Sequence, residues 1–362
     1  YLWLTTLDGI YKINIKSGLD LLDLKNIKIS KGENVKYHNN KVYLSTYNGY
    51  YSLDFIDKKV NELAKGVDYY GIEIVNIDSI EHHLTAWSSG IYEFNEYFST
   101  PTTISQCGPY SMKQDIYDPH LLWVANYDGI SNVYFQDGSW IDRGYIKDFT
   151  LDVSRIKTMG DRLFFSGNSG VFELLNYRYR NSNVKDITGS LPTTNMIIIE
   201  VVDGQLIAGT EKGLYRLKED NWEKVLMKNM PDIEDLTVHR FKQLSNDQIW
   251  SVLYSENDSY RFHTGYFTYD KGEFIWHETA FQSINNELFN DFDLDENGNV
   301  IAAGLNYVAR YKNINNRHVH DSTVTLISEI KIGDSLKFGY LAFNQKQDFL
   351  NKIPFDLNHL EF

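Results

Sequence analysis

Aromatic side chains beside amides and carboxylates are the residues of this chain best suited to chemistry, and that chemistry is recognition. Aromatic rings stack on the C–H faces of sugars, while amide and carboxylate groups bind hydroxyls. Such residues precede a recurring glycine, at Tyr47, Asn48, Trp87, Asn126, Tyr127, Asp128 and Glu211. Further candidates on nearby connections are Tyr69, Tyr70, Tyr110 and Arg143. We expect a surface for a carbohydrate or another small ligand; alternatively, Trp87 and the tyrosines cap the ends of sheets.

Fragments of metal-binding patterns also occur, but none is complete. Asp293-x-Asp295-x-Asn297-Gly298 matches half of a calcium loop, yet Gly304 stands where a bidentate glutamate is needed. A hairpin turn explains these residues better. His318-x-His320 with Asp321 lacks a nameable further ligand, and His82-His83 would point to opposite faces of a strand. We predict neither a metal nor a cofactor.

Covalent catalysis has no support in the sequence. There is no Gly-x-Ser-x-Gly elbow, and the lone Cys107 has no evident partner. No phosphate-binding loop or dinucleotide fingerprint appears. We predict no catalytic residue in this span; the alternative is an active site assembled from distant segments.

A phrase repeated about every 40 residues must position all of these side chains. A bulky residue, a small residue two positions later, a turn and a glycine are followed by an apolar-aromatic pair. The glycines at 9, 49, 90, 129, 170 and 213 are 40, 41, 39, 41 and 43 apart, and two blurred copies start at Trp250 and Ile301. The first of these is interrupted by an insertion at 255–260. This period of short strands predicts a β-propeller of four-stranded blades.

The form of each phrase fits one strand, a hairpin and the next strand. The bulky and small residues are two apart and therefore share a strand face. The bulky one can pack between blades, the small one suits the crowded part where blades converge, and the glycine favours a tight hairpin. One blade cannot bury its own faces, so the ring must be complete.

Composition narrows the class further. The 362 residues carry a net charge of −14 and no long basic run, which argues against nucleic-acid binding. No stretch approaches the roughly 20 apolar residues of a membrane helix. Cys107 is the single cysteine of the sequence, so an internal disulfide is excluded. Because Tyr1 already lies inside a repeat, we expect the natural protein to begin earlier.

The phrases are similar to two-component regulator propeller repeats, with an acidic-glycine turn, a strand, a small residue and Gly-Leu-Tyr. Thr210 to Leu217 is a close match, as is the turn at 293–300, and Gly189-Ser190-Leu191-Pro192 resembles the linker between blades. The tail, with strands expected at 323–330, 335–338 and 358–362, resembles the opening of an immunoglobulin-like triple-tyrosine domain. A sandwich needs about 100 residues, so that domain would be incomplete.

The expected domains are a propeller over 1–320 and the incomplete sandwich over 321–362. Eight phrases allow eight blades, but family members typically carry two seven-bladed propellers. Seven blades are favoured, with residues 1–20 closing an upstream propeller and the segment 21–29 sealing this one.

The resemblance implies an extracytoplasmic, periplasmic sensor module of a membrane-anchored bacterial receptor. Its cytoplasmic end would be a histidine kinase or a DNA-binding regulator, its ligand often a glycan, and its active form often a homodimer. The alternatives are a structural or secretion-associated interaction propeller, and a propeller enzyme such as a lyase or lactonase.

Overall fold

The computed structural model describes a chain of β-strands and turns. The described residues are 2–6, 9–13, 18–55, 57, 59–66, 68–94, 101–177, 182–192, 196–231, 236–255, 262–279, 281, 284, 287–312, 329–332, 335–339 and 360–361. No helix of the length and apolar character of a membrane span occurs among them.

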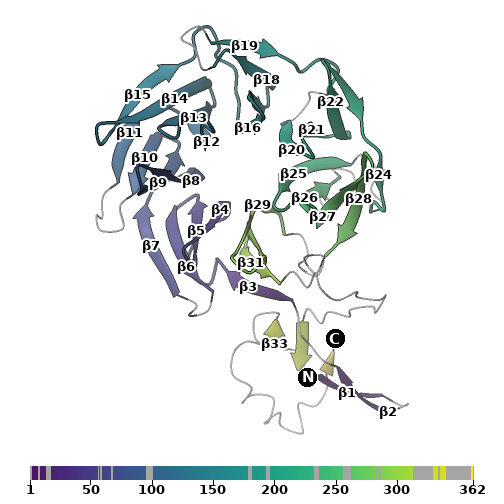
Figure 1. Cartoon of the computed structure of the whole chain (residues 1–362). Coiled ribbons are helices and arrows are strands. Elements are labelled where there is room, and N and C mark those ends of the chain that lie inside the picture. The colour runs from purple at the N-terminus through teal and green to yellow at the C-terminus, as the bar shows by residue number, and fades with distance from the viewer. Residues whose placement is uncertain are drawn as a thin grey trace.

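Seven blades surround a central channel, as the sequence predicted (Figure 1). Blade 1 contains β4 (Gly32–His38), β5 (Lys41–Thr46), β6 (Gly49–Asp54) and β7 (Lys59–Lys65). Blade 2 contains β8 (Tyr69–Ile77), β9 (Ile80–Trp87), β10 (Gly90–Phe94) and β11 (Thr102–Ser105). Blade 3 contains β12 (Pro109–Gln114), β13 (Leu121–Asn126), β14 (Gly129–Gln136) and β15 (Ser139–Tyr145).

The next three blades follow the same antiparallel order. Blade 4 contains β16 (Arg155–Met159), β17 (Arg162–Gly167), β18 (Gly170–Leu175) and β19 (Asn183–Asp186). Blade 5 contains β20 (Ile198–Val202), β21 (Gln205–Thr210), β22 (Gly213–Lys218) and β23 (Asn221–Lys224). Blade 6 contains β25 (Thr237–Gln243), β26 (Ile249–Tyr254), β27 (Phe262–Asp270) and β28 (Glu273–Glu278), and β24 (Met227–Lys228) adds a short parallel strand beside β28.

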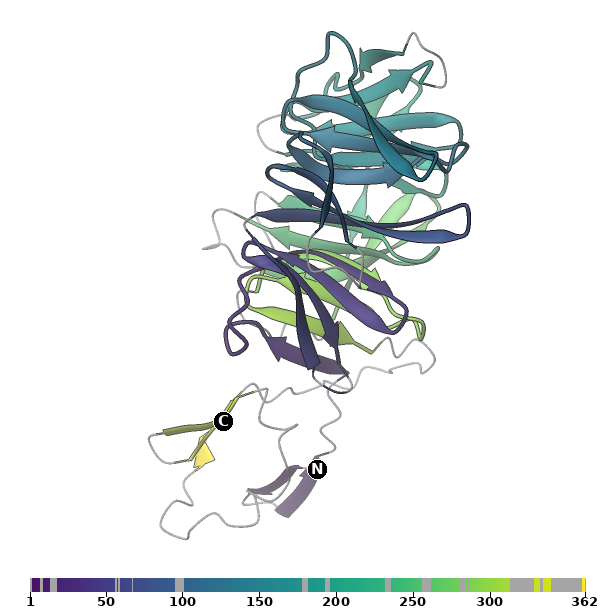
Figure 2. The same cartoon turned by 90° about the vertical axis from the view of Figure 1, so that its left-hand side faces the viewer.

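Blade 7 closes the ring with a strand from the other end of the chain. Its inner strands are β29 (Phe289–Leu294), β30 (Val300–Gly304) and β31 (Tyr307–Tyr311), and its outer strand is β3 (Leu19–Asp23). β3 pairs antiparallel with β31, from Leu19 opposite Tyr311 to Asp23 opposite Tyr307. The predicted sealing segment is therefore confirmed, although its strand starts and ends earlier than 21–29. Figure 2 shows the same ring turned by 90°.

The core lies between blades, where the repeated phrase places its side chains. The bulky Trp123 of blade 3 packs with Val153 of the following link and with Ile156 and Phe165 of blade 4. The small residue two positions later, such as Ala125, is fully buried. A Cβ on Gly209, the smallest residue at this position, would lie 2.8 Å from Val238 of the next blade. Small residues are thus required where neighbouring blades approach.

The recurrent glycines satisfy both a backbone and a spatial requirement. Gly90 has φ +148°, and a Cβ there would lie 2.1 Å from the carbonyl oxygen of Ser105. Gly129 has φ +142°, with Phe149 O at 2.7 Å from its would-be Cβ. Gly170 (φ +134°) and Gly213 (φ +101°) share such conformations, which are open mainly to glycine. Gly49 has no such φ and is required by space, because a Cβ there would lie 2.8 Å from Ala64 O.

Strands outside the ring come from both ends of the chain. The first phrase forms a hairpin of β1 (Leu2–Thr6) and β2 (Gly9–Ile13), so it does not supply an eighth blade. β32 (Glu329–Ile332), β33 (Ser335–Gly339) and β34 (Leu360–Glu361) form a three-stranded sheet. The predicted boundary at 320/321, His318, His320, Asp321 and most of the insertion at 255–260 lie outside the described residues.

Candidate functional site

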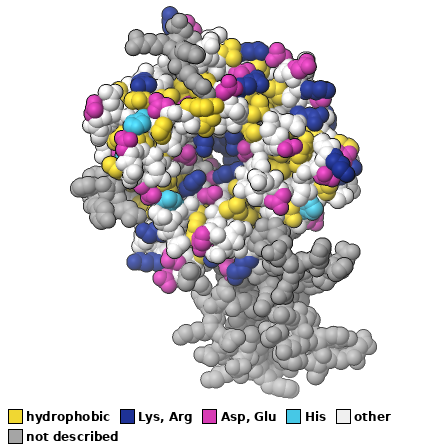
Figure 3. Space-filling view, in the orientation of Figure 1, with side chains coloured by type: hydrophobic (Ala, Val, Ile, Leu, Met, Phe, Trp, Pro, Cys, Tyr) yellow, Lys and Arg dark blue, Asp and Glu magenta, His cyan; other side chains and the backbone are white. Residues whose placement is uncertain are grey.

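The inner strands β4, β8, β12, β16, β20, β25 and β29 meet around the ring and line one cavity of about 380 Å³. Strand directions place the turns between second and third strands on the same face as the links between blades, which we name the link face. Asp152 from a link and Asn168 from a turn join the lining, so the cavity reaches this face. Figure 3 shows basic and acidic side chains around the hollow at the centre.

The lining is strongly charged and nearly balanced, unlike the acidic chain as a whole. Its cations are Lys36, Lys113, Arg155, Lys157, Arg240 and Lys242, and its carboxylates are Glu33, Glu73, Asp152, Glu200 and Asp291. The side-chain alternation of a strand explains the pattern in blade 6, where Arg240 and Lys242 face the cavity and Phe241 between them is packed into the core.

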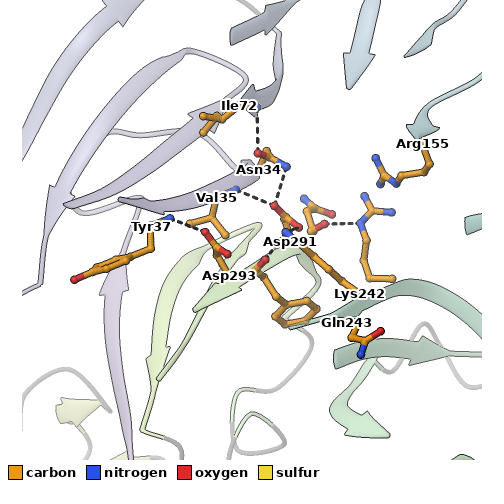
Figure 4. A network of polar contacts seen from close by, with 12 residues as sticks. Asn34, Val35, Tyr37, Ile72, Arg155, Lys242, Gln243, Asp291 and Asp293 are labelled. Atoms are coloured by element: carbon orange, nitrogen blue, oxygen red, sulfur yellow. Dashed lines mark hydrogen bonds and ion pairs between the residues drawn. The ribbon is translucent and has the colours of Figure 1, made fainter. Parts of the chain in front are cut away.

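Asp291 is the centre of a network that joins blade 6, blade 7 and blade 1 (Figure 4). Its carboxylate accepts hydrogen bonds from Lys242 Nζ at 2.8 Å and from Asn34 Nδ2 at 2.7 Å. It also accepts the Val35 amide at 3.2 Å, while Asn34 Oδ1 accepts the Ile72 amide of blade 2 at 3.2 Å. Burial acts to lower the pKa of Lys242, but attraction to Asp291 prevails and raises it.

Two further ion pairs bridge neighbouring inner strands. Lys157 Nζ lies 2.6 Å from Glu200 Oε2, and Lys113 Nζ lies 3.8 Å from Glu73 Oε1. Glu200 also accepts the amide of Gln243 at 3.1 Å. These charges therefore hold adjacent blades together.

Arg155 and Arg240 differ from the other channel cations. Arg155 donates only to the Ser154 carbonyl, at 3.4 Å, and Arg240 donates to the carbonyls of Asn290 and His239. Within the described residues, neither has a carboxylate within ion-pair distance. Burial lowers the pKa of both guanidinium groups, and repulsion from Arg155 helps to lower the pKa of Arg240 to about 10. A pKa of about 10 leaves Arg240 charged at neutral pH.

Tyrosines from three blades lie at the link-face end of the cavity. The rings of Tyr70 and Tyr110, both in the lining, have centroids 5.4 Å apart. Lys31 Nζ lies 3.8 Å above the ring of Tyr47. Burial, with nearby Asp68, raises the pKa of Tyr70 to about 12, and Tyr47 and Tyr110 contribute to the same rise. Aromatic rings and polar groups therefore lie together at the link-face end of the cavity, which we call its mouth.

The structure brings only part of the predicted surface to the mouth. Tyr47 and the exposed Tyr127 lie near it, since Tyr47 interacts electrostatically with Tyr70 and Tyr127 with Tyr110. Asn48 is occupied within its turn, because Oδ1 accepts the Ser30 amide at 3.0 Å and the Ser30 hydroxyl at 2.9 Å. Glu211 lies half-buried in the turn between β21 and β22.

The remaining predicted residues serve their own blades. Trp87 stacks on Tyr92 at 4.1 Å and packs edge-on against Tyr69 at 4.3 Å, as expected of a residue that caps its blade. Asn126 is buried and donates to the Ser131 hydroxyl at 3.0 Å. Asp128 interacts with the hydroxyl of Tyr145, whose pKa is raised by burial and by this contact. Arg143 lies on the outer strand β15, stacked 3.6 Å from the ring of Tyr134.

The metal-like patterns have structural explanations where the structure describes them. Asp295 Oδ1 accepts the amides of Asn297 at 2.9 Å and Asn299 at 2.8 Å, and Oδ2 accepts Arg310 Nε at 2.8 Å. This is the hairpin turn that the sequence predicted between β29 and β30.

A group that could ligate a cation joins blades 1 and 2 at the opposite face. The ligand atoms of His38, Glu81 and His83 lie within 4.8 Å of one another. Glu81 contacts both imidazoles, at 2.5 Å for His38 and 2.6 Å for His83, so its charge is already matched by hydrogen bonds. His82 points the other way, toward Glu93, as alternation predicts.

The sequence analysis did not single out Arg155, Arg240 or Lys242. The available signal was the pair of cations two positions apart, Arg155-x-Lys157 and Arg240-x-Lys242, within strands that precede each phrase. It also missed His38 as a partner of His83, because the two are 45 residues apart and meet only through blade packing.

Comparison with known proteins supports the fold alone. No family model and no curated protein matches the sequence. The extracellular domain of the hybrid two-component system BT4673 from B. thetaiotaomicron is similar in structure, with a TM-score of 0.59 and 12% sequence identity. The match covers 81% of this chain and 39% of that chain. The corresponding domain of BT3049 from the same organism gives a TM-score of 0.55 and 14% sequence identity, and the match covers 80% of this chain and 41% of that chain.

A propeller enzyme is similar to a comparable degree. Streptogramin B lyase gives a TM-score of 0.56 and 15% identity over 81% of this chain and 96% of that chain. This chain spans about two fifths of the length of the two sensor domains, so the comparison with them covers one part of those proteins.

Proposed function

We propose that this chain is a ligand-sensing module from the extracytoplasmic part of a bacterial hybrid two-component receptor or a related regulator. The observation that carries the proposal is the charged cavity at the centre of a propeller that is similar to the sensor domains of such receptors. The hairpin of β1 and β2 would then belong to an upstream propeller, and the sheet of β32 to β34 to a triple-tyrosine domain.

The ligand would enter from the link face. Tyr70, Tyr110 and Tyr47 offer aromatic faces, and Asp152 and Asn168 offer hydroxyl-binding groups beside them. A carbohydrate suits this combination because its C–H faces stack and its hydroxyls bind polar groups. The ligand would change the output of the receptor only if it bound one conformation of the receptor more tightly than the other. We propose that these two conformations belong to a homodimer.

This span would bind its ligand without converting it. The group of described residues that could hold a metal, His38 with Glu81 and His83, has no member in the cavity lining. The similarity to streptogramin B lyase keeps a propeller enzyme as the second candidate. Conversion of a bound compound by the purified protein would favour that candidate over the sensor.

Two experiments test the sensor. The natural reading frame around these residues should encode a membrane segment and a histidine kinase or DNA-binding domain; a gene without them contradicts the proposal. A thermal-shift screen against oligosaccharides should find a stabilising compound, and Tyr110→Ala should lose the effect while Tyr117→Ala keeps it. Tyr117 is a matched control because it is 52% exposed and lies in the turn between β12 and β13 on the opposite face.

A further inference from the structure

We propose that Arg155 and Arg240 bind an oxyanion inside the channel, as the carboxylate, sulfate or phosphate group of a small molecule. The two arginines come from blade 4 and blade 6, and both line the central cavity. The inference deepens the proposed sensing function and rests on it for its biological meaning, but the binding itself is a separate claim.

The first argument is that the other channel cations have acidic neighbours. Lys157 pairs with Glu200, Lys242 with Asp291 and Lys113 with Glu73. Lys36 acts electrostatically on Asp293. Arg155 and Arg240 are the two lining cations of the described part that contact only backbone carbonyls.

The second argument is that the carboxylates that act electrostatically on both arginines already have other partners. Glu33 and Asp291 are the acidic groups that act on both guanidinium groups. Glu33 Oε1 lies 3.1 Å from Lys31 Nζ. Asp291 accepts from Lys242, Asn34 and the Val35 amide. Two positive charges therefore remain without a direct negative partner.

The third argument concerns geometry and solvation. Figure 4 shows Arg155 pointing across the channel toward the Asp291 network without a marked contact. Ser154 also belongs to the cavity lining, and its buried hydroxyl has no partner among the described groups. Guanidinium groups present planar donor pairs that match oxyanions, and such charge-assisted bonds are strong where water is partly excluded. Two guanidinium groups that line one cavity therefore offer paired donors to an oxyanion.

Placing Arg155 and Arg240 in one cavity destabilises the folded protein when no anion is bound. Two like charges face one cavity, and partial burial removes some of their hydration. Burial lowers the pKa of Arg240 most, and repulsion from Arg155 lowers it further. A bound anion would relieve this repulsion, which gives the arginines a function that packing does not.

The test is a calorimetric and thermal-shift titration of the purified chain with sodium sulfate, phosphate or citrate. Ionic strength is held constant with sodium chloride, because sulfate also stabilises proteins by exclusion from their surface. At least one anion should bind saturably at millimolar or lower concentration. Arg155→Gln should weaken that binding about 10-fold or more, since it removes charge-assisted bonds, and Arg240→Gln should do the same.

Two controls keep the result interpretable. Lys59→Gln removes one exposed positive charge from the outer strand β7 and should bind as the wild type does. Without anion, Arg155→Gln should melt at the same temperature as the wild type or higher, since it removes repulsion and one weak contact at 3.4 Å. If Arg155→Gln does not fold, the wild-type titration and Arg155→Lys decide the question.

The outcomes are separable. Citrate binding alone assigns a carboxylate ligand, sulfate alone a sulfated ligand, and phosphate alone a phosphorylated one. No saturable binding of any of the three anions, or equal binding by wild type and both glutamine variants, overturns the proposal. The sensing function would then rest on Tyr47, Tyr70 and Tyr110 at the link-face end of the cavity. Binding in a protein whose gene lacks a membrane segment and an output domain retains the anion site and removes the sensing role.

Discussion

Asn34 Nδ2 donates to Asp291 Oδ2 at 2.7 Å, and this bond joins the first blade to the last across 257 residues of sequence. The ring is thus closed at its centre as well as at its rim, where β3 completes blade 7. The same carboxylate binds Lys242 of blade 6, so one acidic group holds three blades together.

Asp291→Ala should therefore destabilise the whole ring. The change removes the carboxylate that accepts from Lys242, Asn34 and the Val35 amide, and leaves Lys242 Nζ only the Phe292 carbonyl. Breaking a buried pair from one side costs about 2–4 kcal/mol. The free energy of unfolding from urea titrations measures the loss. Asp137→Asn, in an exposed turn, should change it by less than about 0.5 kcal/mol. Equal stability of Asp291→Ala and wild type would contradict a closing role for Asp291.

Deletion of residues 1–23 should destroy cooperative unfolding, because it removes β3 and leaves β31 with an unpaired edge. Deletion of residues 1–17 retains β3 and is the matched control, expected to melt close to the full chain. Circular dichroism melts compare the two. If both deletions melt alike, β3 is not the strand that seals the ring.

Gly90 and Gly138 both have a positive φ, but only at Gly90 would an added Cβ also collide with a neighbouring atom. Gly90→Ala should cost about 3 kcal/mol or more, because φ is +148° and a Cβ would meet Ser105 O at 2.1 Å. Gly138→Ala should cost only about 1 kcal/mol, since φ is +76° with nothing within 4 Å. Urea titrations should give this order, and the reverse order would refute the packing described for the blade ends.

His239 should make the fold sensitive to mild acid. Burial lowers its pKa well below the usual value, repulsion from Arg240 and Arg155 adds to this, and Asn290 opposes it; the ring also lies 5.8 Å from that of Tyr254. The unfolded chain then binds the proton more readily. Stability is complete above the unfolded pKa of about 6.5 and falls below it by up to about 1.4 kcal/mol per pH unit, until the folded pKa is reached.

His239→Gln should remove this part of the acid dependence. Urea titrations at about pH 7.5 and about pH 5.5 bracket the start of the window. The difference between the two pH values should be smaller in the variant than in the wild type. Identical differences would show that His239 is not held neutral in the folded state.

Residues 2–6 and 9–13 show what a repeated phrase can and cannot predict. The phrase reports the second and third strands of a blade, whose packing is nearly the same everywhere, so the blades were predictable from it. The sealing segment was predictable from the resemblance to seven-bladed propellers, and the turn at Asp295 from its own Asp, Asn and Gly residues. The first copy obeys the same local pattern but pairs only within its own hairpin, because membership in a ring depends on neighbours.

The channel was less predictable because its side chains differ from blade to blade. Asn34, Glu73, Lys113, Arg155 and Arg240 line the cavity from five different inner strands, and four residue types occur among them. Their pairing is decided by which blades face or adjoin each other. A sequence read along one strand does not contain that information, whereas capping residues such as Trp87 are conspicuous within their own phrase.

Hydrogen–deuterium exchange with the most stabilising oligosaccharide of the thermal-shift screen tests the central claim, that ligands bind in the channel from the link face. Exchange should slow at the inner-strand segments 110–113, 155–157 and 240–242, which line the cavity. The outer strands β7 and β15 should exchange as before. Protection confined to outer strands, with the inner segments unchanged, would contradict the account.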